Sequence, residues 1–318
     1  MIPLYRDAYA KGVLKERVER ALSWMTKCTL CPRMCKVNRL ENQKGRCLLG
    51  RYAVVASYGP HFGEESPLVG RNGSGTIFFA GCNLGCIFCQ NYDISHTSDG
   101  YVVSPAQLAE IMLELQRMGC HNINFVTPSH VIPQILESLP YAVEKGLNVP
   151  LVYNSSGYDR VAALKLLDGI VDIYMPDFKF WDPALSKRWC DADDYPDRAR
   201  SALKEMHRQV GDLIIEDGIA VRGLLVRHLV MPGFLEDTRQ ILKFIAEEIS
   251  PNTYINVMDQ YRPMGELLEK REWDEIDRNL LRMLRHDEYL AALRMAQEFG
   301  LYRIDDRRSI FKWLFRER

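Results

Sequence analysis

The sequence of 318 residues has no long hydrophobic run, no low-complexity tract and no strict short repeat. A membrane-spanning helix needs about 20 consecutive apolar residues, so the sequence offers no candidate for one. The first residues alternate charged and apolar side chains in a helical pattern, and we therefore predict that they are not a secretory signal peptide. These absences lead us to expect a cytoplasmic protein without a membrane partner.

An excess of charge of one sign is also lacking. The chain carries 41 Lys and Arg residues against 42 Asp and Glu residues, which gives a formal net charge of -1. This balance argues against a protein whose whole function is to hold nucleic acid. Residues 1–51 are nevertheless basic, with twelve Lys and Arg against four Asp and Glu, and the plainest interpretation is a solvated basic face.

Cysteine, by contrast, is plentiful. The chain has nine cysteines, and both the odd count and a reducing compartment argue against structural disulfides. Seven of them fall into two groups, namely Cys28, Cys31, Cys35 and Cys47, and then Cys82, Cys86 and Cys89. We predict that these groups serve metal or redox chemistry, whereas Cys120 and Cys190 are most simply core or surface thiols.

From about residue 75 onward, apolar β-rich runs alternate with amphipathic helical stretches, which is the pattern of parallel βα units. The predicted strands are Thr76–Ala80, Asn122–Thr127, Val149–Tyr153, Val171–Met175, Gly223–Val230 and Thr253–Met258. The predicted helices between them are Pro105–Met118, Val131–Glu144, Arg160–Leu167, Pro183–Gln209 and Leu235–Glu248. Six such units make an α/β fold that is an open, partial TIM-like barrel, with functional loops at the carboxyl ends of the strands.

We divide the chain into three regions. Residues 1–70 form an N-terminal extension with a helix near Asp7–Met25 and a Cys-rich irregular segment, residues 71–262 form the partial barrel, and residues 263–318 form a C-terminal helical extension. Helices are predicted in the last region at Trp273–Leu284 and Glu288–Phe299. The basic amphipathic stretch Arg307–Arg318 is interpreted as a packed terminal helix.

The segment Gly81–Asn91 reads GCNLGCIFCQN and places a C-x3-C-x2-C triplet directly after the first predicted barrel strand. Three thiolates can hold three irons of a cubane cluster, and the fourth iron is then open to a small molecule. An electron-carrying cluster normally has four protein ligands. The alternatives are a zinc knuckle or accidental spacing.

The triplet, with Phe88 before its last cysteine, resembles the motif of radical S-adenosylmethionine (SAM) enzymes, in which SAM chelates the open iron. The longer stretch His61–Asn91 resembles the branch that is similar to pyruvate formate-lyase activating enzymes, and the resemblance covers nearly the whole chain. It implies a partial (βα)6 barrel of the radical SAM type, a 4Fe–4S cluster on Cys82, Cys86 and Cys89, and reductive cleavage of SAM to a 5′-deoxyadenosyl radical that abstracts hydrogen.

The same resemblance implies partners. The substrate would be a glycyl radical enzyme or another polypeptide, and the electron donor would be a reduced flavodoxin-like or ferredoxin-like protein. A small-molecule or peptide-modifying reaction is the alternative, because the Gly-Gly-Glu motif of the activating enzymes is replaced here by Thr127, Pro128, Ser129 and His130.

SAM contacts are implied at successive strand ends. At the end of the second strand the polar candidates are Thr127, Ser129 and His130. The other candidates are Asn154, Ser155 and Ser156 after the third strand, Asp177 and Lys179 after the fourth, Arg227 in the fifth and Gln260 after the sixth. Each has a plainer alternative as a helix cap or an ion-pair partner. No catalytic residue is predicted.

The N-terminal group has the spacing C-x2-C-x3-C-x11-C and supplies four thiolates. Four sulfurs suit either structural zinc or an auxiliary 4Fe–4S cluster, and spacing does not choose between them. A metal-free loop is the third alternative. His61 is a further possible ligand, but Glu64 and Glu65 of the same HFGEE segment suggest that it lines the approach to the active site.

Two functions of other classes compete with the enzyme. One is a non-catalytic iron–sulfur electron carrier, which should have four ligands for every cluster and no SAM pocket. The other is a zinc-stapled RNA-binding protein that uses basic residues such as Lys36 and Arg39, although the chain lacks a stacked aromatic platform. Nucleic acid is therefore not the expected partner.

Overall fold

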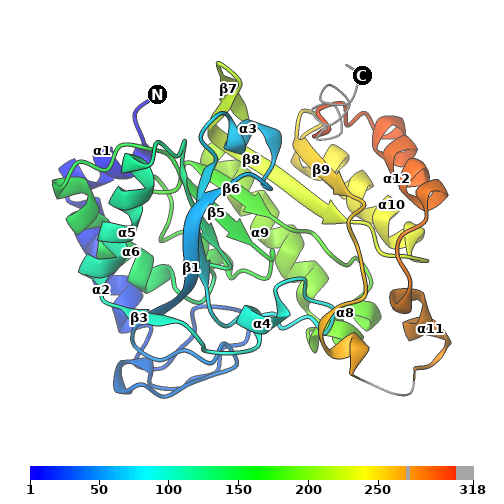
Figure 1. Ribbon diagram of the computed structural model, residues 1–318, viewed down its shortest axis with the longest axis horizontal. Coiled ribbons are helices and arrows are strands. Elements are labelled where there is room, and N and C mark those ends of the chain that lie inside the picture. Colours follow the sequence, from blue (N-terminus) through cyan, green and yellow to red (C-terminus); the bar gives the residue numbers. More distant parts are fainter. Residues whose placement is uncertain (270–272, 306–318) are drawn as a thin grey trace.

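The computed structural model describes residues 1–269 and 273–305, and its centre is a nine-stranded sheet (Figure 1). The strand order is β3-β1-β2-β4-β5-β6-β8-β7, and β9 pairs with β8. The strands are β1 (Ala53–His61), β2 (Ser74–Phe79), β3 (Tyr101–Val103), β4 (Ile123–Val126), β5 (Leu151–Ser155), β6 (Ile173–Pro176), β7 (Ile214–Glu216), β8 (Ile219–Leu229) and β9 (Tyr254–Met258).

The six predicted barrel strands are β2, β4, β5, β6, β8 and β9, and neighbouring pairs among them run parallel. Every residue of β4, β5 and β6 is buried, which explains why these strands read as apolar runs without alternation. The predicted α/β partial barrel is confirmed.

Helices and short turns cover the sheet (Figure 1). The α-helices are α1 (Leu4–Ala10), α2 (Val13–Ser23), α3 (Ser66–Val69), α4 (Tyr92–Ser95), α5 (Pro105–Arg117), α6 (Ile132–Glu144), α7 (Val161–Leu164), α8 (Pro183–Cys190), α9 (Tyr195–Val210), α10 (Leu235–Phe244), α11 (Glu275–Arg278) and α12 (His286–Glu298). Among these residues, no helix is both long and apolar enough to cross a membrane. The start of α5 is fixed by a capping box between Ser104 and Gln107.

Three predicted helices differ from the observed ones because a local backbone feature interrupts them. The helix expected over Asp7–Met25 is split into α1 and α2 at Gly12, whose φ is 74°. The one expected over Pro183–Gln209 is split into α8 and α9 at Asp191, which is also left-handed with a φ of 50°. The one expected over Leu235–Glu248 ends as α10 at Phe244 and continues as a π-turn over Ile245–Ile249.

Three antiparallel strands were not predicted. β1 pairs with β2 and β3 pairs with β1 at one edge, and β7 pairs with β8. β1 therefore lies in the sheet although its residues fall within the region 1–70; the three-region division itself stays a prediction. At the C-terminal end α11 and the 3-10 turn Asn279–Leu281 occupy the predicted segment Trp273–Leu284. The segment Arg307–Arg318 lies outside the described residues.

The N-terminal helices are fastened to the barrel by hydrogen bonds. The Leu4 N–H donates to Asp172 Oδ1 at 2.8 Å, and the Tyr5 hydroxyl donates to the Val149 carbonyl at 3.0 Å. Both α1 and α2 pack on α6. From α2 the chain continues into the Cys-rich segment, which Figure 1 shows in blue below β3 and α4.

Candidate active site

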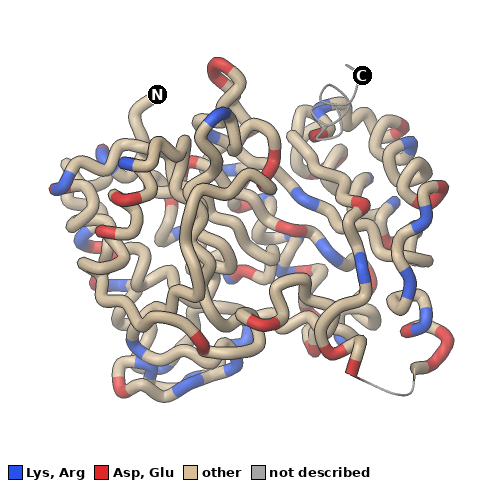
Figure 2. The backbone as a smooth tube through the Cα atoms, viewed as in Figure 1, with Lys and Arg blue, Asp and Glu red and all other residues tan. Residues whose placement is uncertain are grey.

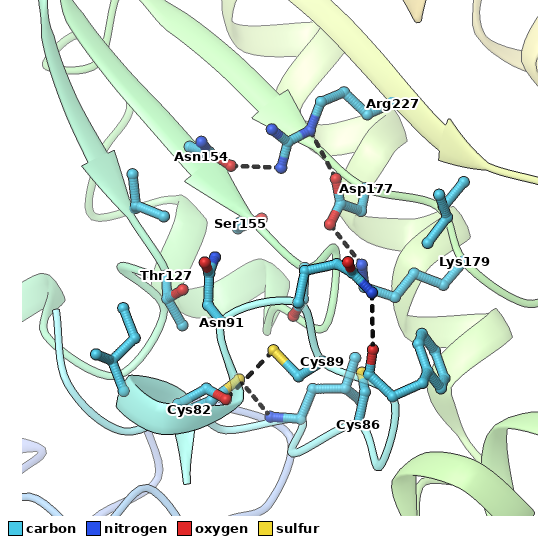
Figure 3. Close-up of a pocket in the computed structure, with 18 of the residues that line it drawn as sticks. Cys82, Cys86, Cys89, Asn91, Thr127, Asn154, Ser155, Asp177, Lys179 and Arg227 are labelled. Atoms are coloured by element: carbon cyan, nitrogen blue, oxygen red, sulfur yellow. Dashed lines mark hydrogen bonds and ion pairs between the residues drawn. The ribbon is translucent and has the colours of Figure 1, made fainter. Parts of the chain in front are cut away.

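The register of the parallel strands brings the predicted site residues to one edge of the sheet. Phe78 pairs with Val126, Val126 with Asn154, and Asn154 with Met175. The residues that follow these positions therefore leave the sheet at the same level. The cysteine loop follows β2 at this edge, and the strand arrows in Figure 3 point toward it.

A cavity of about 220 Å³ lies at this edge (Figure 3). All three cysteines of the loop line it, together with most of the polar residues predicted at the strand ends. The predicted residues in its wall are Cys82, Cys86, Cys89, Thr127, Asn154, Ser155, Ser156, Asp177, Lys179, Arg227 and Gln260. Residues more than 170 positions apart in the sequence thus meet around one space.

Ser129 and His130 are not among the residues that line this cavity. Thr127 has a left-handed φ of 61°, and the chain turns there into α6. His130 is buried, and its Nε2 lies 2.9 Å from the Ala80 carbonyl while its own carbonyl accepts from Arg39 Nη1 at 2.6 Å. Burial and then the charge of Arg39 lower the pKa of His130 to about 3. The residue thus supports the backbone behind the cysteine loop.

Each cysteine sulfur of the loop receives a hydrogen bond from a different group. The Leu84 N–H donates to Cys82 Sγ at 3.3 Å, the Ser95 hydroxyl donates to Cys89 Sγ at 3.2 Å, and the Cys190 thiol donates to Cys86 Sγ at 3.3 Å. These donors stabilise sulfurs that carry negative charge, as iron ligands do.

The burial of these sulfurs fits an iron–sulfur cluster. Burial raises the pKa of Cys82 to about 12 and also raises that of Cys89. Thiolates at such positions need the compensating charge of a metal. Within residues 1–269 and 273–305, no group of three or more His, Cys, Asp or Glu side chains is arranged around a single metal ion. The three cysteines line one cavity, which suits ligands to different irons of one cluster.

Opposite the cysteines, four polar side chains form a connected network. Asp177 accepts from Arg227 Nε at 2.7 Å and from Lys179 Nζ at 2.6 Å, and Arg227 Nη2 donates to Asn154 Oδ1 at 2.7 Å. Burial alone would raise the pKa of Asp177, but the charges of Arg227 and Lys179 outweigh burial and lower it. The pKa of Lys179 is raised, because Asp177 and Cys86 outweigh its burial. Two fixed cations and one carboxylate therefore face the cysteine loop.

The HFGEE segment lies behind this network, outside the cavity wall. Glu64 Oε2 is 3.8 Å from Arg227 Nη1, and Glu65 Oε1 accepts from Asn256 Nδ2 at 2.7 Å. Both carboxylates are buried. The segment thus supports Arg227 and ties the loop before β2 to β9.

Several residues around the cavity were not predicted from the sequence. Asn91 and Gln90 directly follow the triplet, and Ser95 lies in the short helix α4. Their nearness to the triplet in the sequence was an available signal. Cys190 had no such signal, because 104 positions separate it from Cys86.

The Cys-rich N-terminal segment packs directly against the cysteine loop. Cys28, Cys31 and Cys47 are buried, and burial together with the other cysteines of the group, Cys47 foremost, raises the pKa of Cys31 to about 12. A Cβ atom at Gly81 would lie 2.1 Å from the Cys47 carbonyl oxygen. The Cys-rich segment therefore lies directly against the loop, and among the described residues its cysteines are not arranged around one metal ion.

Two arginines of this segment bind backbone rather than solvent. Arg39 is 1% exposed and donates to the carbonyls of Gly50 and His130, so it is not available to an RNA backbone. Arg33 donates to the carbonyls of Asn83, Leu84, Cys190 and Asp191. Figure 2 shows the basic residues of the segment gathered at the lower left of the molecule.

Comparison with known proteins identifies the family. The family model described as the radical SAM superfamily matches residues 76–245, which is more than half of the chain. The chain belongs to the radical SAM superfamily. The family implies an enzyme that binds SAM and a 4Fe–4S cluster and carries out SAM-cleavage chemistry. It therefore favours the enzyme over the electron-carrier alternative.

This radical SAM protein is also similar to individual proteins. An uncharacterized protein of Methanocaldococcus jannaschii is 34% identical over 305 residues, which cover 93% of this chain and 81% of the relative. Among solved structures, methylornithine synthase is 14% identical with a TM-score of 0.45 and covers 72% of this chain and 63% of its own. The radical SAM methyltransferase TsrM from Kitasatospora setae is 16% identical with a TM-score of 0.43 and covers 59% of this chain and 34% of its own. The chain thus spans less than two-thirds of each of these solved chains.

Proposed function

We propose that this protein is a radical SAM enzyme whose 4Fe–4S cluster is held by Cys82, Cys86 and Cys89, and that it abstracts hydrogen from a polypeptide. The observation that carries the proposal is the cavity in which the three cysteine sulfurs face the Asp177, Lys179 and Arg227 network. When bound, the cluster supplies the electron that cleaves SAM to methionine and a 5′-deoxyadenosyl radical. The protein's own residues bind and orient the reactants.

The cations of the cavity suit the carboxylate of SAM. Lys179 and Arg227 both bind Asp177, and Arg227 also lies 3.8 Å from Glu64, so these carboxylates hold both cations in place. Asn154, Ser155 and Ser156 supply hydroxyl and amide groups for the amino group and ribose. Ser155 is itself fixed by a 2.6 Å hydrogen bond to the buried Asp159. Because these groups are positioned before SAM arrives, binding requires little ordering of side chains.

The cluster proposal is tested by anaerobic reconstitution of the full chain with iron and sulfide. We expect the electron paramagnetic resonance (EPR) signal of the reduced cluster to change when SAM is added, and 5′-deoxyadenosine to form on reduction. An unchanged signal without 5′-deoxyadenosine would refute the enzyme.

The ligand assignment is tested by Cys86→Ala. We expect SAM cleavage to be lost while the far-ultraviolet circular dichroism spectrum is kept, because the core of the sheet does not include the cluster. Cys120→Ala, which changes a buried cysteine outside both groups, is the matched control and should cleave SAM normally. Retained cleavage in Cys86→Ala would mean that the cluster has other ligands.

The proposal of a polypeptide substrate rests on the resemblance to the activating enzymes. The residues that line the cavity of about 220 Å³ are those proposed to hold the cluster and SAM. The proposed hydrogen donor is an exposed loop of a glycyl radical enzyme or a peptide. The electron donor we propose is a reduced flavodoxin-like or ferredoxin-like protein. Deuterium transfer from a candidate peptide into 5′-deoxyadenosine, measured by mass spectrometry, identifies the substrate.

For Cys28, Cys31, Cys35 and Cys47 we propose an auxiliary iron–sulfur cluster, and zinc is the alternative. All nine cysteines are free thiols, which suits the reducing cytoplasm that we propose as the location. A triple alanine variant at Cys82, Cys86 and Cys89 isolates the N-terminal group. We expect iron and sulfide in this variant by elemental analysis; zinc alone, or no metal, would overturn the proposal.

A further inference from the structure

Cys190 is a buried thiol in contact with the cysteine loop. It is the last residue of α8 and is 1% exposed. Its Sγ lies 3.3 Å from Cys86 Sγ and is placed to donate a hydrogen bond to it. A disulfide would bring the two sulfurs to about 2.05 Å, so the contact is one between two separate sulfur atoms.

Three interactions hold the end of α8 against the loop. The Ile87 N–H donates to the Trp189 carbonyl at 3.0 Å, one residue on each side of the sulfur contact. Arg33 Nη2 donates to the Cys190 carbonyl at 2.7 Å. On the far side, Trp189 Nε1 donates to Asp277 at 2.8 Å. Backbone on the loop side and the side chains of Arg33 and Asp277 therefore hold the end of α8, and with it Cys190, in position.

We propose that Cys190 is a positioning residue whose S–H hydrogen bond to Cys86 sets the reduction potential of the cluster. This inference rests on the proposed function, in which Cys86 is an iron ligand. The other two sulfurs receive their hydrogen bonds from Leu84 and Ser95, and Cys190 supplies the one that reaches the third. The proton remains on Cys190, and no bond is formed or broken.

The physical effect follows from charge. Reduction adds one electron to the cluster and increases the negative charge on its sulfur ligands. A donor that points at a ligand sulfur therefore stabilises the reduced state more than the oxidised state and raises the potential. Loss of one such donor should change the reduction equilibrium by about tenfold, which for one electron is about 59 mV toward more negative potential.

The test is an EPR-monitored redox titration of the full-length reconstituted protein without SAM. Cys190→Ala should shift the reduction equilibrium about tenfold toward the oxidised state, which lowers the potential by about 59 mV. Cys190→Ser, which keeps a hydroxyl donor, should recover at least half of this shift in potential. Cys120→Ala is the matched control, because it makes the same change at a buried cysteine and should leave the potential unchanged. A native potential in Cys190→Ala, a Ser variant as low as Ala, or an equal shift in the control would each overturn the proposal.

A second measurement does not depend on the variants loading fully. In D2O, pulsed EPR of the native cluster should show an exchangeable deuteron coupled to the cluster that is absent from Cys190→Ala. An identical deuteron spectrum in the two proteins would overturn the proposal. This failure is distinguishable from failure of the proposed function. If the native protein cleaves SAM but the potential in Cys190→Ala is unaltered, only the role of Cys190 is refuted.

Discussion

At the scale of single residues, the chain contains two Lys–Asp pairs with the same separation and different surroundings. Lys179 Nζ and Lys187 Nζ each lie 2.6 Å from an aspartate oxygen. The Lys179 and Asp177 side chains are 15% and 11% exposed, whereas those of Lys187 and Asp191 are 58% and 61% exposed. An exposed pair contributes little, because water screens its charges. The buried pair is the one that can act on a ligand.

Lys179→Met should weaken SAM binding by about tenfold or more, since it removes a charged partner of the SAM carboxylate. Asp177 keeps Arg227 as a partner in this variant, so the site retains its remaining ion pair. Lys187→Met makes the same chemical change at the exposed pair and should bind SAM normally. Equilibrium dialysis of the reconstituted proteins measures both affinities. Equal dissociation constants for the two variants would remove Lys179 from the SAM site.

A second prediction concerns acid. Burial lowers the pKa of His228 to about 4 from the ordinary value of 6.5. The unfolded chain binds this proton more readily than the folded chain does. The contribution of neutral His228 to the free energy of unfolding is therefore fully present above pH 6.5, and it falls by up to about 3 kcal/mol as the pH drops from 6.5 to 4. His228→Asn keeps a donor near the Phe178 carbonyl and should flatten the pH dependence.

Urea unfolding at intervals between pH 7 and 4.5 measures this effect. The control is His286→Asn at an exposed position. The prediction fails if the native protein and His228→Asn lose the same free energy of unfolding over this range.

Whether the sequence predicts a residue of the cavity depends on whether a local pattern determines where that residue lies. Asn154, Asp177 and Lys179 were found because parallel strands end at one edge, so that position along the chain determines position in space. Ser129 and His130 obey the same rule, but the left-handed turn at Thr127 carries them behind the loop. The Cys190 contact depends on packing between remote elements, and no local pattern encodes it.

At the scale of elements, one side chain joins the Cys-rich segment, the cysteine loop and α8. The Arg33 guanidinium donates to four carbonyls, of which two belong to the loop and two to the end of α8. These carbonyls have few other donors at a place where three irregular stretches of backbone meet. Arg33 therefore satisfies backbone acceptors where separate elements meet, as a capping side chain satisfies backbone groups at the end of a helix.

Arg33→Ala should lower the free energy of unfolding by about 2 to 3 kcal/mol, because it removes the donor to four backbone carbonyls, three of them in partly buried hydrogen bonds. It should also reduce the iron bound after reconstitution. Arg20→Ala, which removes an arginine that lies over Trp24 on α2, is the control and should cost less than about 1 kcal/mol. Normal stability with full iron content in Arg33→Ala would contradict this role.

The elements themselves were predicted where long apolar patterns dominate. The six parallel strands and the helices α5 and α6 were recognised because their burial is continuous or periodic. The splits at Gly12 and Asp191 were missed, since the amphipathic pattern continues across both breaks. β3 and β7 are three residues long, which is too short for a pattern to emerge.

At the scale of the whole molecule, the N-terminal region and the barrel share one core and one sheet. β1 is paired in the sheet, and Tyr5, Leu14 and Ala21 of the first helices belong to the same hydrophobic cluster as the barrel strands. Asp172 in turn receives hydrogen bonds from Leu4 and Leu151. We therefore expect one cooperative unfolding transition for these parts.

Thermal unfolding followed by far-ultraviolet circular dichroism and by tryptophan fluorescence should give coincident curves for the native chain. Deletion of residues 1–23 should lower the midpoint by at least about 5 °C, because it exposes the covered face of α6 and removes a donor from Asp172. Two separate transitions, or an unchanged midpoint after the deletion, would show that the N-terminal helices fold independently.

The left-handed backbone of Thr127 has an energetic consequence. A β-branched residue at a φ of 61° is strained by about 1 to 3 kcal/mol, and glycine would adopt this conformation without strain. The fold therefore keeps a strained residue in the wall of the cavity, where glycine would relieve the strain but would remove the hydroxyl group.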